Sequence, residues 1–232
     1  MNLRVGTSGF SYKEWKGPFY PEKLPDREML QFYGTHLTAV EINNTFYRMP
    51  RRTVLSTWAT QVPDDFRFVI KASRRITHFK RLKEANEPMD YLVSNTSDLG
   101  DKLGALLFQL PPNMKMDLVR LAAFLELVPD AVHAAFEFRH ETWFDASVYK
   151  LLSEHNCALV HADGEDSIYP LVSTADWGYL RLRRPEYGRE ALDQWHKRII
   201  DMEWRECFVF FKHEDEGAGP KLAMGFVTQK ET

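Results

Sequence analysis

The chain has 232 residues, a length that one α/β barrel fills as a single domain and that two smaller domains also fill. Hydrophobic residues make up 44% and charged residues 27%, which is typical of a globular protein with a large core. A formal net charge of -3 argues against a surface that attracts nucleic acid or a membrane through charge, although a local basic face is compatible with it.

Short apolar runs alternate with longer stretches of helical periodicity along the whole chain. The runs typical of strands are, in chain order, 3–7, 38–43, 66–72, 105–110, 133–139, 157–163, 178–183 and 207–213. The stretches that predict helices are 26–37, 51–62, 89–103, 117–128, 146–156, 188–202 and, after the last strand, 218–227. Strands that alternate with helices in this way predict a parallel sheet.

Eight strand units in a chain of this length favour closure of that sheet. We therefore predict a single (β/α)8 TIM-like barrel domain over residues 1–232. The alternative is an open doubly wound sheet. The GTSG run from Gly6 to Gly9 matches neither a Walker motif nor a dinucleotide fingerprint, so no phosphate loop supports the open sheet.

The two cysteines and the N-terminal residues bear on the compartment. Cys157 and Cys207 begin apolar runs and do not form a loop framework, which predicts buried, reduced thiols and favours the cytoplasm. The opening MNLRVGTSGF has no long apolar core, and no window approaches the ~20 apolar residues of a membrane span. We expect a soluble cytoplasmic protein without membrane contact, and the sequence sets no oligomeric state.

The segment AAFEFRHETW, residues 134–143, has the clearest alternation. Phe136 and Phe138 share one face of the expected strand, and Glu137 and Arg139 share the other. In a barrel the apolar face packs on the helices, and active sites collect at the carboxyl ends of the strands. The polar residues at or just beyond the strand ends are Ser8, Glu41, Asn43, Lys71, Ser73, Gln109, Glu137, Arg139, His161, Asp163, Arg181, Arg183, and Lys212 or His213. Because unpaired buried charges cost several kcal/mol, this set predicts either a functional site or an interior network of ion pairs.

Several stretches resemble the domain of unknown function 72, or YecE-like, family. They run through most of the chain: GTSGFSYKEWKGPFYP (6–21), VEINNTFYRMP (40–50), FVIKASRRITH (68–78), LGALLFQLPPNM (103–114), EFRHETW (137–143) and YLRLR (179–183). The resemblance implies a TIM-like barrel and supplies no chemistry. The chain departs from the family's pattern after the last strand, where similar proteins tend to have two asparagines and this one reads FFKHEDEGAGP, so the roles of Lys212 and His213 stay open.

The candidate residues fall into three chemical groups. Glu41 and Glu137 are candidates for a general acid and base if burial separates their pKa values, with His140 as a third catalytic candidate that shuttles protons. Lys71, Arg139 and Arg181 are candidates for a clamp on an anion, because arginine binds phosphate or carboxylate through two nitrogens. The remaining substrate-binding candidates are Ser8, Asn43, His78 and Gln109, and the aromatic residues Tyr12, Trp15, Tyr47 and Trp143, for which packing of loops onto the barrel is the alternative.

Three functional hypotheses follow. The first is an enzyme without a cofactor that acts on a small anionic ligand such as phosphate, a phosphorylated metabolite or a nucleotide-like substrate; nucleic acid itself is not supported by the net charge. The second is a metal-dependent phosphodiesterase or endonuclease-like hydrolase. Its ligands would come from His78, His140, His161, Asp163, Glu41 and Glu137, which lack a recognised metal-binding spacing such as HExxH. The third is a non-catalytic barrel that binds an anionic ligand.

Overall fold

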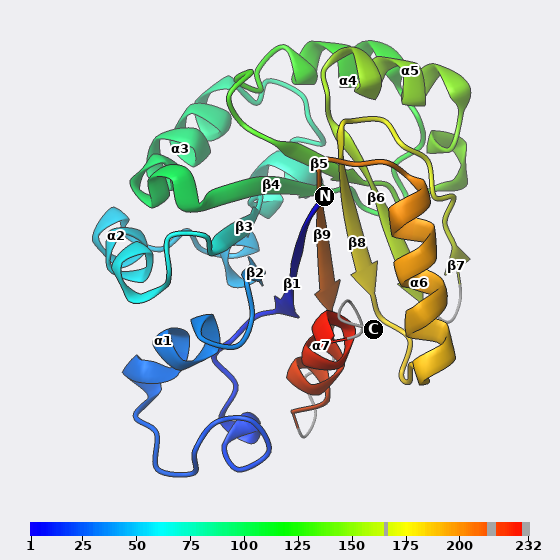
Figure 1. Cartoon of the computed structure of the whole chain (residues 1–232). Helices are drawn as coiled ribbons and strands as arrows, with labels where there is room; N and C mark the ends of the chain where they lie inside the picture. Colours follow the sequence, from blue (N-terminus) through cyan, green and yellow to red (C-terminus); the bar gives the residue numbers. More distant parts are fainter. Residues whose placement is uncertain (165–166, 213–216, 229–232) are drawn as a thin grey trace.

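Eight parallel strands form a closed ring in the middle of the molecule (Figure 1). The computed structural model describes residues 1–164, 167–212 and 217–228. The ring consists of β1 (Asn2–Ser8), β2 (Ala39–Ile42), β3 (Arg67–Lys71), β4 (Leu103–Gln109), β5 (Ala134–Glu137), β6 (Ala158–Gly164), β8 (Trp177–Leu182) and β9 (Glu206–Phe211). Each strand pairs in parallel with its neighbours, β9 returns to β1, and β5 pairs with β6, so the ring has no open edge. The predicted TIM-like barrel is confirmed, and the open-sheet alternative is wrong.

The helices surround this ring in Figure 1. They are α1 (Met29–Gly34), α2 (Arg52–Gln61), α3 (Asn86–Thr96), α4 (Leu118–Leu125), α5 (Ala146–Glu154), α6 (Arg189–Asp201) and α7 (Ala218–Thr228). Short helical turns supplement them: η1 (Lys13–Trp15), η2 (Asp26–Glu28), η3 (Asn44–Phe46), η4 (Arg75–Phe79), η5 (Ser97–Lys102) and η6 (Glu141–Trp143). Side-chain caps fix two of the starts, because the Asp117 and Asp145 carboxylates accept hydrogen bonds from the first-turn amides of α4 and α5.

Two predicted helices and one connection differ from the sequence expectation. The expected helix 26–37 is a 3-10 turn followed by the six residues of α1, and the expected helix 89–103 begins at Asn86 and becomes a 3-10 turn after Thr96. Between β6 and β8 the chain forms the short strand β7 (Ser167–Ile168), which pairs antiparallel with β6. The described residues 169–176 of this connection contain no helix.

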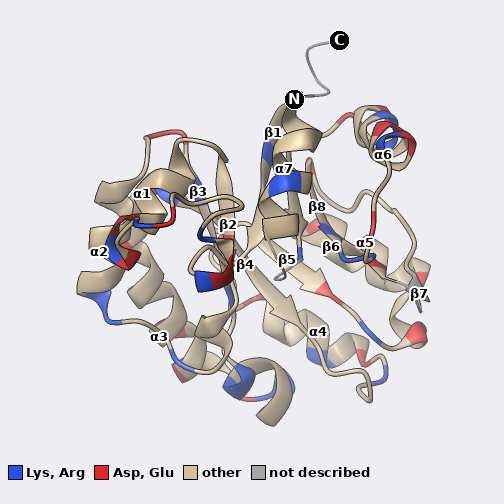
Figure 2. Cartoon of the chain, turned by 90° about the horizontal axis from the view of Figure 1, so that it is seen from below, with Lys and Arg blue, Asp and Glu red and all other residues tan. Residues whose placement is uncertain are grey.

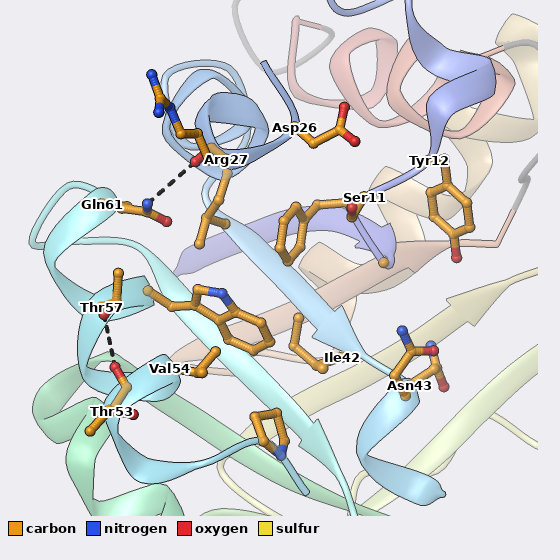
Figure 3. A pocket seen from close by; sticks show the side chains of 16 residues that line it. Ser11, Tyr12, Asp26, Arg27, Ile42, Asn43, Thr53, Val54, Thr57 and Gln61 are labelled. Carbon is orange, nitrogen blue, oxygen red and sulfur yellow. Dashed lines mark hydrogen bonds between the residues drawn. The ribbon is translucent and has the colours of Figure 1, made fainter. Parts of the chain in front are cut away.

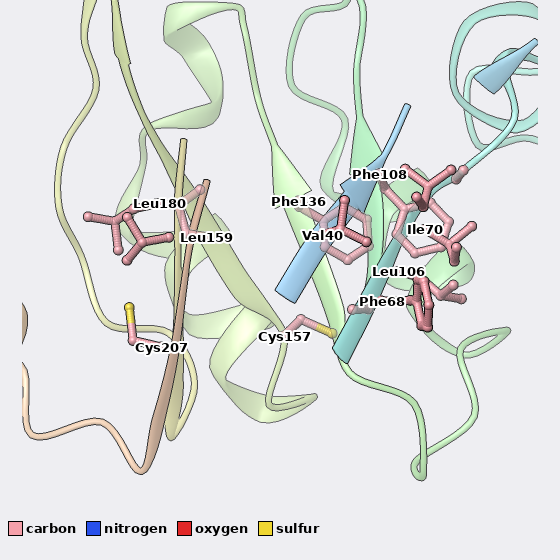
Figure 4. Close-up of a cluster of buried hydrophobic side chains, with 14 of the residues drawn as sticks. Val40, Phe68, Ile70, Leu106, Phe108, Phe136, Cys157, Leu159, Leu180 and Cys207 are labelled. Carbon is pink, nitrogen blue, oxygen red and sulfur yellow. The ribbon is translucent and has the colours of Figure 1, made fainter. Parts of the chain in front are cut away.

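The main core lies between the outer face of the ring and the helices. Figure 4 shows part of it, with apolar side chains from neighbouring strands packed side by side. Phe136 and Phe138 are almost completely buried here, as the alternation predicts; the Phe136 ring stacks on Phe108 with centroids 5.2 Å apart. Cys157 and Cys207 are buried free thiols in the same layer, and burial raises the pKa of both, that of Cys157 to about 12.

A second, smaller core fills the inside of the barrel. It consists of Ala39, Val69, Ala105, Leu107, Ala135, Ala158, Val160, Trp177, Tyr179, Phe208 and Phe210. The small residues come from β2, β4, β5 and β6, and the large aromatic ones come from β8 and β9, so the rings occupy the space that the alanines leave. This layer closes the barrel from below. The polar residues that follow on the same inward-pointing faces of the strands therefore lie at the carboxyl end of the barrel.

Charged residues are interspersed on the outside of the barrel. Figure 2 shows basic and acidic segments mixed on the surrounding helices in that view. This mixture agrees with the small net charge of -3. Within the described chain, no helix combines the length and the apolar character that crossing a membrane requires.

Candidate functional site

A cavity of about 500 Å³ lies at the carboxyl end of the barrel. Its lining residues are Ser8, Tyr12, Asn43, Asn44, Phe46, Tyr47, Lys71, His78, Gln109, Arg139, Arg181, Arg183 and Lys212. We call it the cationic cavity, because five of these side chains carry lysine or arginine charges and none carries a carboxylate. Strand alternation and register bring the residues together: Ser8 lies beside Glu41 across β1 and β2, and Gln109 lies beside Glu137 across β4 and β5.

Two buried carboxylates lie beneath the cavity, and both bind the same arginine. Nη2 of Arg181 is 2.7 Å from Oε1 of Glu41, and Nη1 of Arg181 is 2.5 Å from Oε2 of Glu137. Both glutamates and Arg181 are at most 2% exposed. The second oxygen of Glu137 accepts a hydrogen bond from Arg183 at 2.5 Å. The polar strand ends therefore include the interior ion-pair network that the sequence left open as an alternative.

Hydrogen bonds complete the surroundings of Glu41. Its Oε1 also accepts from the Ser8 hydroxyl at 2.7 Å and from the Asn43 amide at 2.9 Å, and its Oε2 accepts from the Tyr179 hydroxyl at 2.6 Å. Burial alone would raise the pKa of Glu41, but the Arg181 charge and these hydrogen bonds outweigh burial and lower it. Glu41 is therefore ionised at neutral pH.

The same balance holds Glu137 in its charged form. Burial opposes ionisation, but the charges of Arg181 and Arg183 and a hydrogen bond from Gln109 lower the pKa of Glu137 to about 2. A general acid must carry a proton at the working pH, and an acid and base pair needs pKa values on either side of it. Both pKa values move downward, so the surroundings of Glu41 and Glu137 do not supply the separation of pKa values that the expected acid and base roles require.

Arg181 also has a different place from the one expected. It lines the cationic cavity, but both terminal nitrogens of its guanidinium are bound to Glu41 and Glu137. Arg181 is therefore the centre of the buried network, and its terminal nitrogens are not free to bind an anion. Tyr179, which the sequence reasoning did not single out, belongs to this network, and its shared parity with Arg181 on β8 was the available signal.

Lys71 projects from the end of β3 into the cationic cavity and is half-buried. Its Nζ lies 4.7 Å from the centroid of the Phe46 ring. Among the described residues, no carboxylate lies within ion-pair distance of this ammonium group. Burial and the neighbouring Arg181 charge lower the pKa of Lys71 to about 8, against the opposing effect of Glu41 and Glu137. The pKa of Lys71 is therefore closer to neutral pH than that of an exposed lysine.

The rim of the cavity is both aromatic and cationic. The His78 ring meets Phe46 edge to face at 4.9 Å, and burial, together with the charges of Lys71 and Arg139, lowers the pKa of His78. The solvent-exposed Arg139 lines the cavity from beyond the end of β5. Tyr47 is 70% exposed and lies under the Arg74 guanidinium. A ligand entering the cavity meets a neutral imidazole, an exposed aromatic ring and a guanidinium.

Tyr12 forms a wall of the cavity through the turn after β1. Gly9 has a φ of 107°, and the Tyr12 hydroxyl donates to the Ser8 carbonyl at 2.8 Å. A Cβ at position 9 would lie 2.5 Å from the Tyr12 hydroxyl, so only glycine allows this turn to hold the ring in place.

Besides the two glutamates beneath the cavity, three of the expected site residues do not line it. Trp15 and Trp143 are buried at 1% and 0% exposure, and the Trp143 indole stacks on Phe138 and donates to the Met114 carbonyl at 2.7 Å. The prediction that these two indoles bind substrate is wrong, and the alternative, that they pack loops onto the barrel, is confirmed. His140 is also wrongly placed: its Nδ1 accepts from the Thr142 amide and caps η6, and it does not line the cavity.

The expected parity of β6 is wrong as well. Ala158 and Val160 face the barrel interior, which turns His161 and Asp163 toward the helices. The His161 ring packs on Trp195 of α6 at 4.9 Å, and Asp163 binds Arg184 at 2.8 Å. The small apolar residues fit the crowded interior beside the aromatic rings of β8, which explains the reversal.

The metal hypothesis took two of its six candidate ligands, His161 and Asp163, from β6. Among residues 1–164, 167–212 and 217–228, no three histidine, cysteine or acidic side chains form a group that fits a metal ion. The candidate ligands separate instead, with His161 and Asp163 outside the ring and Glu41 and Glu137 bound to arginine. His213, the remaining doubtful position, lies outside the described residues.

A model of the family described as "Protein of unknown function DUF72" matches residues 4–232. The chain belongs to the DUF72 family. Relatives include UPF0759 protein YunF of Bacillus subtilis, 29% identical over 93% of this chain and 90% of YunF. UPF0759 protein YecE of Escherichia coli K12 is 31% identical over 50% of this chain and 43% of YecE.

Solved DUF72 structures have the same fold. A DUF72 family protein from Thermotoga maritima superposes with a TM-score of 0.87 and 27% identity, covering 100% of both chains. A DUF72 family protein from Enterococcus faecalis has a TM-score of 0.80 and 18% identity over 99% of this chain and 94% of its own, which shows the fold alone. The family resemblance seen in the sequence motifs is confirmed.

Proposed function

We propose that this DUF72 barrel binds a small anionic ligand, such as phosphate or a phosphorylated metabolite, in the cationic cavity and acts on it as an enzyme. The observation that carries the proposal is the charge distribution of the cavity. Five cationic side chains line it, and the two carboxylates that the described residues place beneath it, those of Glu41 and Glu137, are buried and already bound to Arg181 and Arg183. The excess of positive charge attracts an anion.

Arg139 and Lys71 are the proposed contacts to the anion. Neither side chain has a carboxylate within ion-pair distance in the described part of the chain, and both line the cavity. Arg139 presents a planar fork of donors that matches phosphate or carboxylate oxygens. Lys212, at the end of β9, adds a third charge from the opposite side of the ring.

Lys71 is also the proposed proton-transfer group. The two glutamates are ionised and fully engaged, so they hold Arg181 and Arg183 in position beneath the ligand. A lysine whose pKa is about 8 has substantial populations of both protonation states near neutral pH, as a general acid or base requires. We therefore assign to Lys71 the proton transfer that the sequence analysis assigned to Glu41 and Glu137.

A non-catalytic anion-binding barrel is the second candidate. It is favoured by the complete engagement of Glu41 and Glu137, which removes the two side chains that most often perform acid and base chemistry. The enzymatic function is supported if the wild type forms product from a phosphorylated metabolite and Lys71→Met does not. Ligand binding without product from any of them supports the binding barrel.

We expect Arg139→Ala to weaken the binding of inorganic phosphate by about one to two orders of magnitude. A charge-assisted hydrogen bond contributes roughly 1.5–3 kcal/mol, and ~1.4 kcal/mol corresponds to a factor of ten. Isothermal titration calorimetry measures the two dissociation constants. The control is Arg205→Ala, which removes an exposed arginine paired with Asp176 outside the cavity and leaves phosphate binding unchanged. Equal affinities of the wild type and Arg139→Ala would refute the proposed contact.

We expect sulfate affinity to decrease as pH rises through about 8, because Lys71 loses the charge that attracts the anion. Sulfate remains a dianion throughout this range, so the protein's own groups account for the change. Lys71→Met should bind sulfate more weakly below that pH and should lack this pH dependence. A Lys71→Met profile parallel to that of the wild type would assign the titration to another group.

A further inference from the structure

Figure 3 shows a second cavity, of about 630 Å³. It adjoins the cationic cavity, because the two have lining residues in common. It lies between the turn after β1, the start of α1 and the helix α2. We call it the apolar groove and define it by its apolar side chains, Phe10, Leu30, Ile42, Pro50, Val54 and Trp58. A volume of this size is in the range of small-molecule sites.

Three of the polar side chains around the apolar groove, those of Thr57, Gln61 and Asp26, are bound to local partners. The Thr57 hydroxyl donates to the Thr53 carbonyl at 2.8 Å, and the Gln61 amide donates to the Arg27 carbonyl at 3.4 Å; both contacts are drawn in Figure 3. The Asp26 carboxylate is bound by Lys16 at 2.7 Å. The interaction that these walls offer to a ligand is therefore mainly apolar contact.

The apolar groove and the cationic cavity share one wall, which three residues form. Tyr12, Asn43 and Asn44 line both. Figure 3 shows Tyr12 and Asn43 together at one side of the groove, away from Gln61 and Thr57. Asn43 is held there by its hydrogen bond to Glu41 of the buried network, so the shared wall is attached to the floor of the cationic cavity.

We propose that the apolar groove binds an aromatic ring carried by the same ligand whose anionic group occupies the cationic cavity. This inference rests on the proposed function and specifies its substrate class, namely an aryl or heteroaryl phosphate ester. The cationic cavity alone would not distinguish such a ligand from inorganic phosphate. The groove supplies the discrimination through burial of the ring.

The shape of the groove favours a flat ring. Phe10 and Trp58 meet edge to face, with ring centroids 5.7 Å apart and planes at 89°, and so form two sides of a corner. The Trp58 ring also stacks on Phe68 of the core, which fixes its orientation. A planar group inserted at this corner can stack on one ring and meet the other edge to face, which are the preferred geometries of aromatic pairs.

The test compares phenyl phosphate with inorganic phosphate by calorimetry at physiological ionic strength. We expect the wild type to bind phenyl phosphate about tenfold more tightly, a difference of ~1.4 kcal/mol. Val54→Glu places a charge in the groove from an exposed position of α2, so it should abolish this preference and leave phosphate affinity nearly unchanged. The matched control is Val119→Glu on the exposed face of α4, which should retain the preference.

The outcomes separate the two proposals. A preference for phenyl phosphate that Val54→Glu removes and Val119→Glu keeps supports the ring site. Equal affinities for the two ligands, or a preference that survives Val54→Glu, overturn the ring site while Arg139-dependent phosphate binding leaves the proposed function standing. Failure of the wild type to bind either ligand at millimolar concentration overturns both.

Discussion

Replacing Arg181 with methionine should lower the free energy of unfolding by about 3–5 kcal/mol, the usual cost of removing one partner from a buried ion pair. The guanidinium is 2% exposed and holds Glu41 and Glu137, which are 0% and 1% exposed. Methionine fills a similar volume but leaves both carboxylates without their main counter-charge. Urea denaturation of the wild type and the variant, followed by circular dichroism, measures the difference.

The control for this prediction is Arg205→Met. Arg205 pairs with Asp176 at 3.3 Å, but its side chain is 85% exposed, so water screens the pair and its loss should cost no more than about 1 kcal/mol. The deficit of Arg181→Met should also shrink as pH falls from neutral, because a buried carboxyl without its arginine has a raised pKa and gains stability when it takes up a proton. A pH-independent loss below about 1 kcal/mol would contradict the buried network.

Phe136→Ala should cost about 3–5 kcal/mol of unfolding free energy. The ring is fully buried between β5 and the helices, where it stacks on Phe108 and meets Phe124 edge to face. Alanine would leave a cavity in a layer of rings that cannot collapse onto it. Chemical denaturation again gives the value.

Phe79→Ala is the matched control for this truncation. The Phe79 ring is 69% exposed and its main neighbour is the Arg74 guanidinium, so we expect a change within about 1 kcal/mol. Comparable losses for Phe136→Ala and Phe79→Ala would mean that the outer layer of the barrel tolerates a missing ring.

The fold was predictable because local pattern and topology agree in most of the chain. The alternation at Phe136, Glu137 and Phe138 predicted both faces of β5 correctly, since apolar rings are stable only against the helices. The pattern failed in β6. There Leu159, His161 and Asp163 share the outer face, and only the crowding of the interior by Trp177 and Tyr179 shows why the small residues must turn inward.

The candidate site was predictable in composition but not in pairing. Sequence parity brought Glu41, Glu137 and Arg181 to one end of the barrel, but it contains no information about which charge contacts which. Ionisation of the two glutamates depends on distances of 2.5 and 2.7 Å across the ring, which are tertiary geometry. For the same reason the motifs around Trp15 and Trp143 could not separate an indole that packs from one that binds.

The Arg181 contacts connect segments that are far apart along the chain. Arg181 is 140 residues from Glu41 and 44 residues from Glu137 in sequence. Bringing such distant segments together costs loop-closure entropy, which is recovered only when many contacts form at once. We therefore expect both glutamates to lose their hydration only when β8 docks between β6 and β9. Desolvation of these carboxylates and completion of the barrel should then coincide, because a chain that stops short of β8 lacks Tyr179 and Arg181, the partners that Glu41 has on that strand.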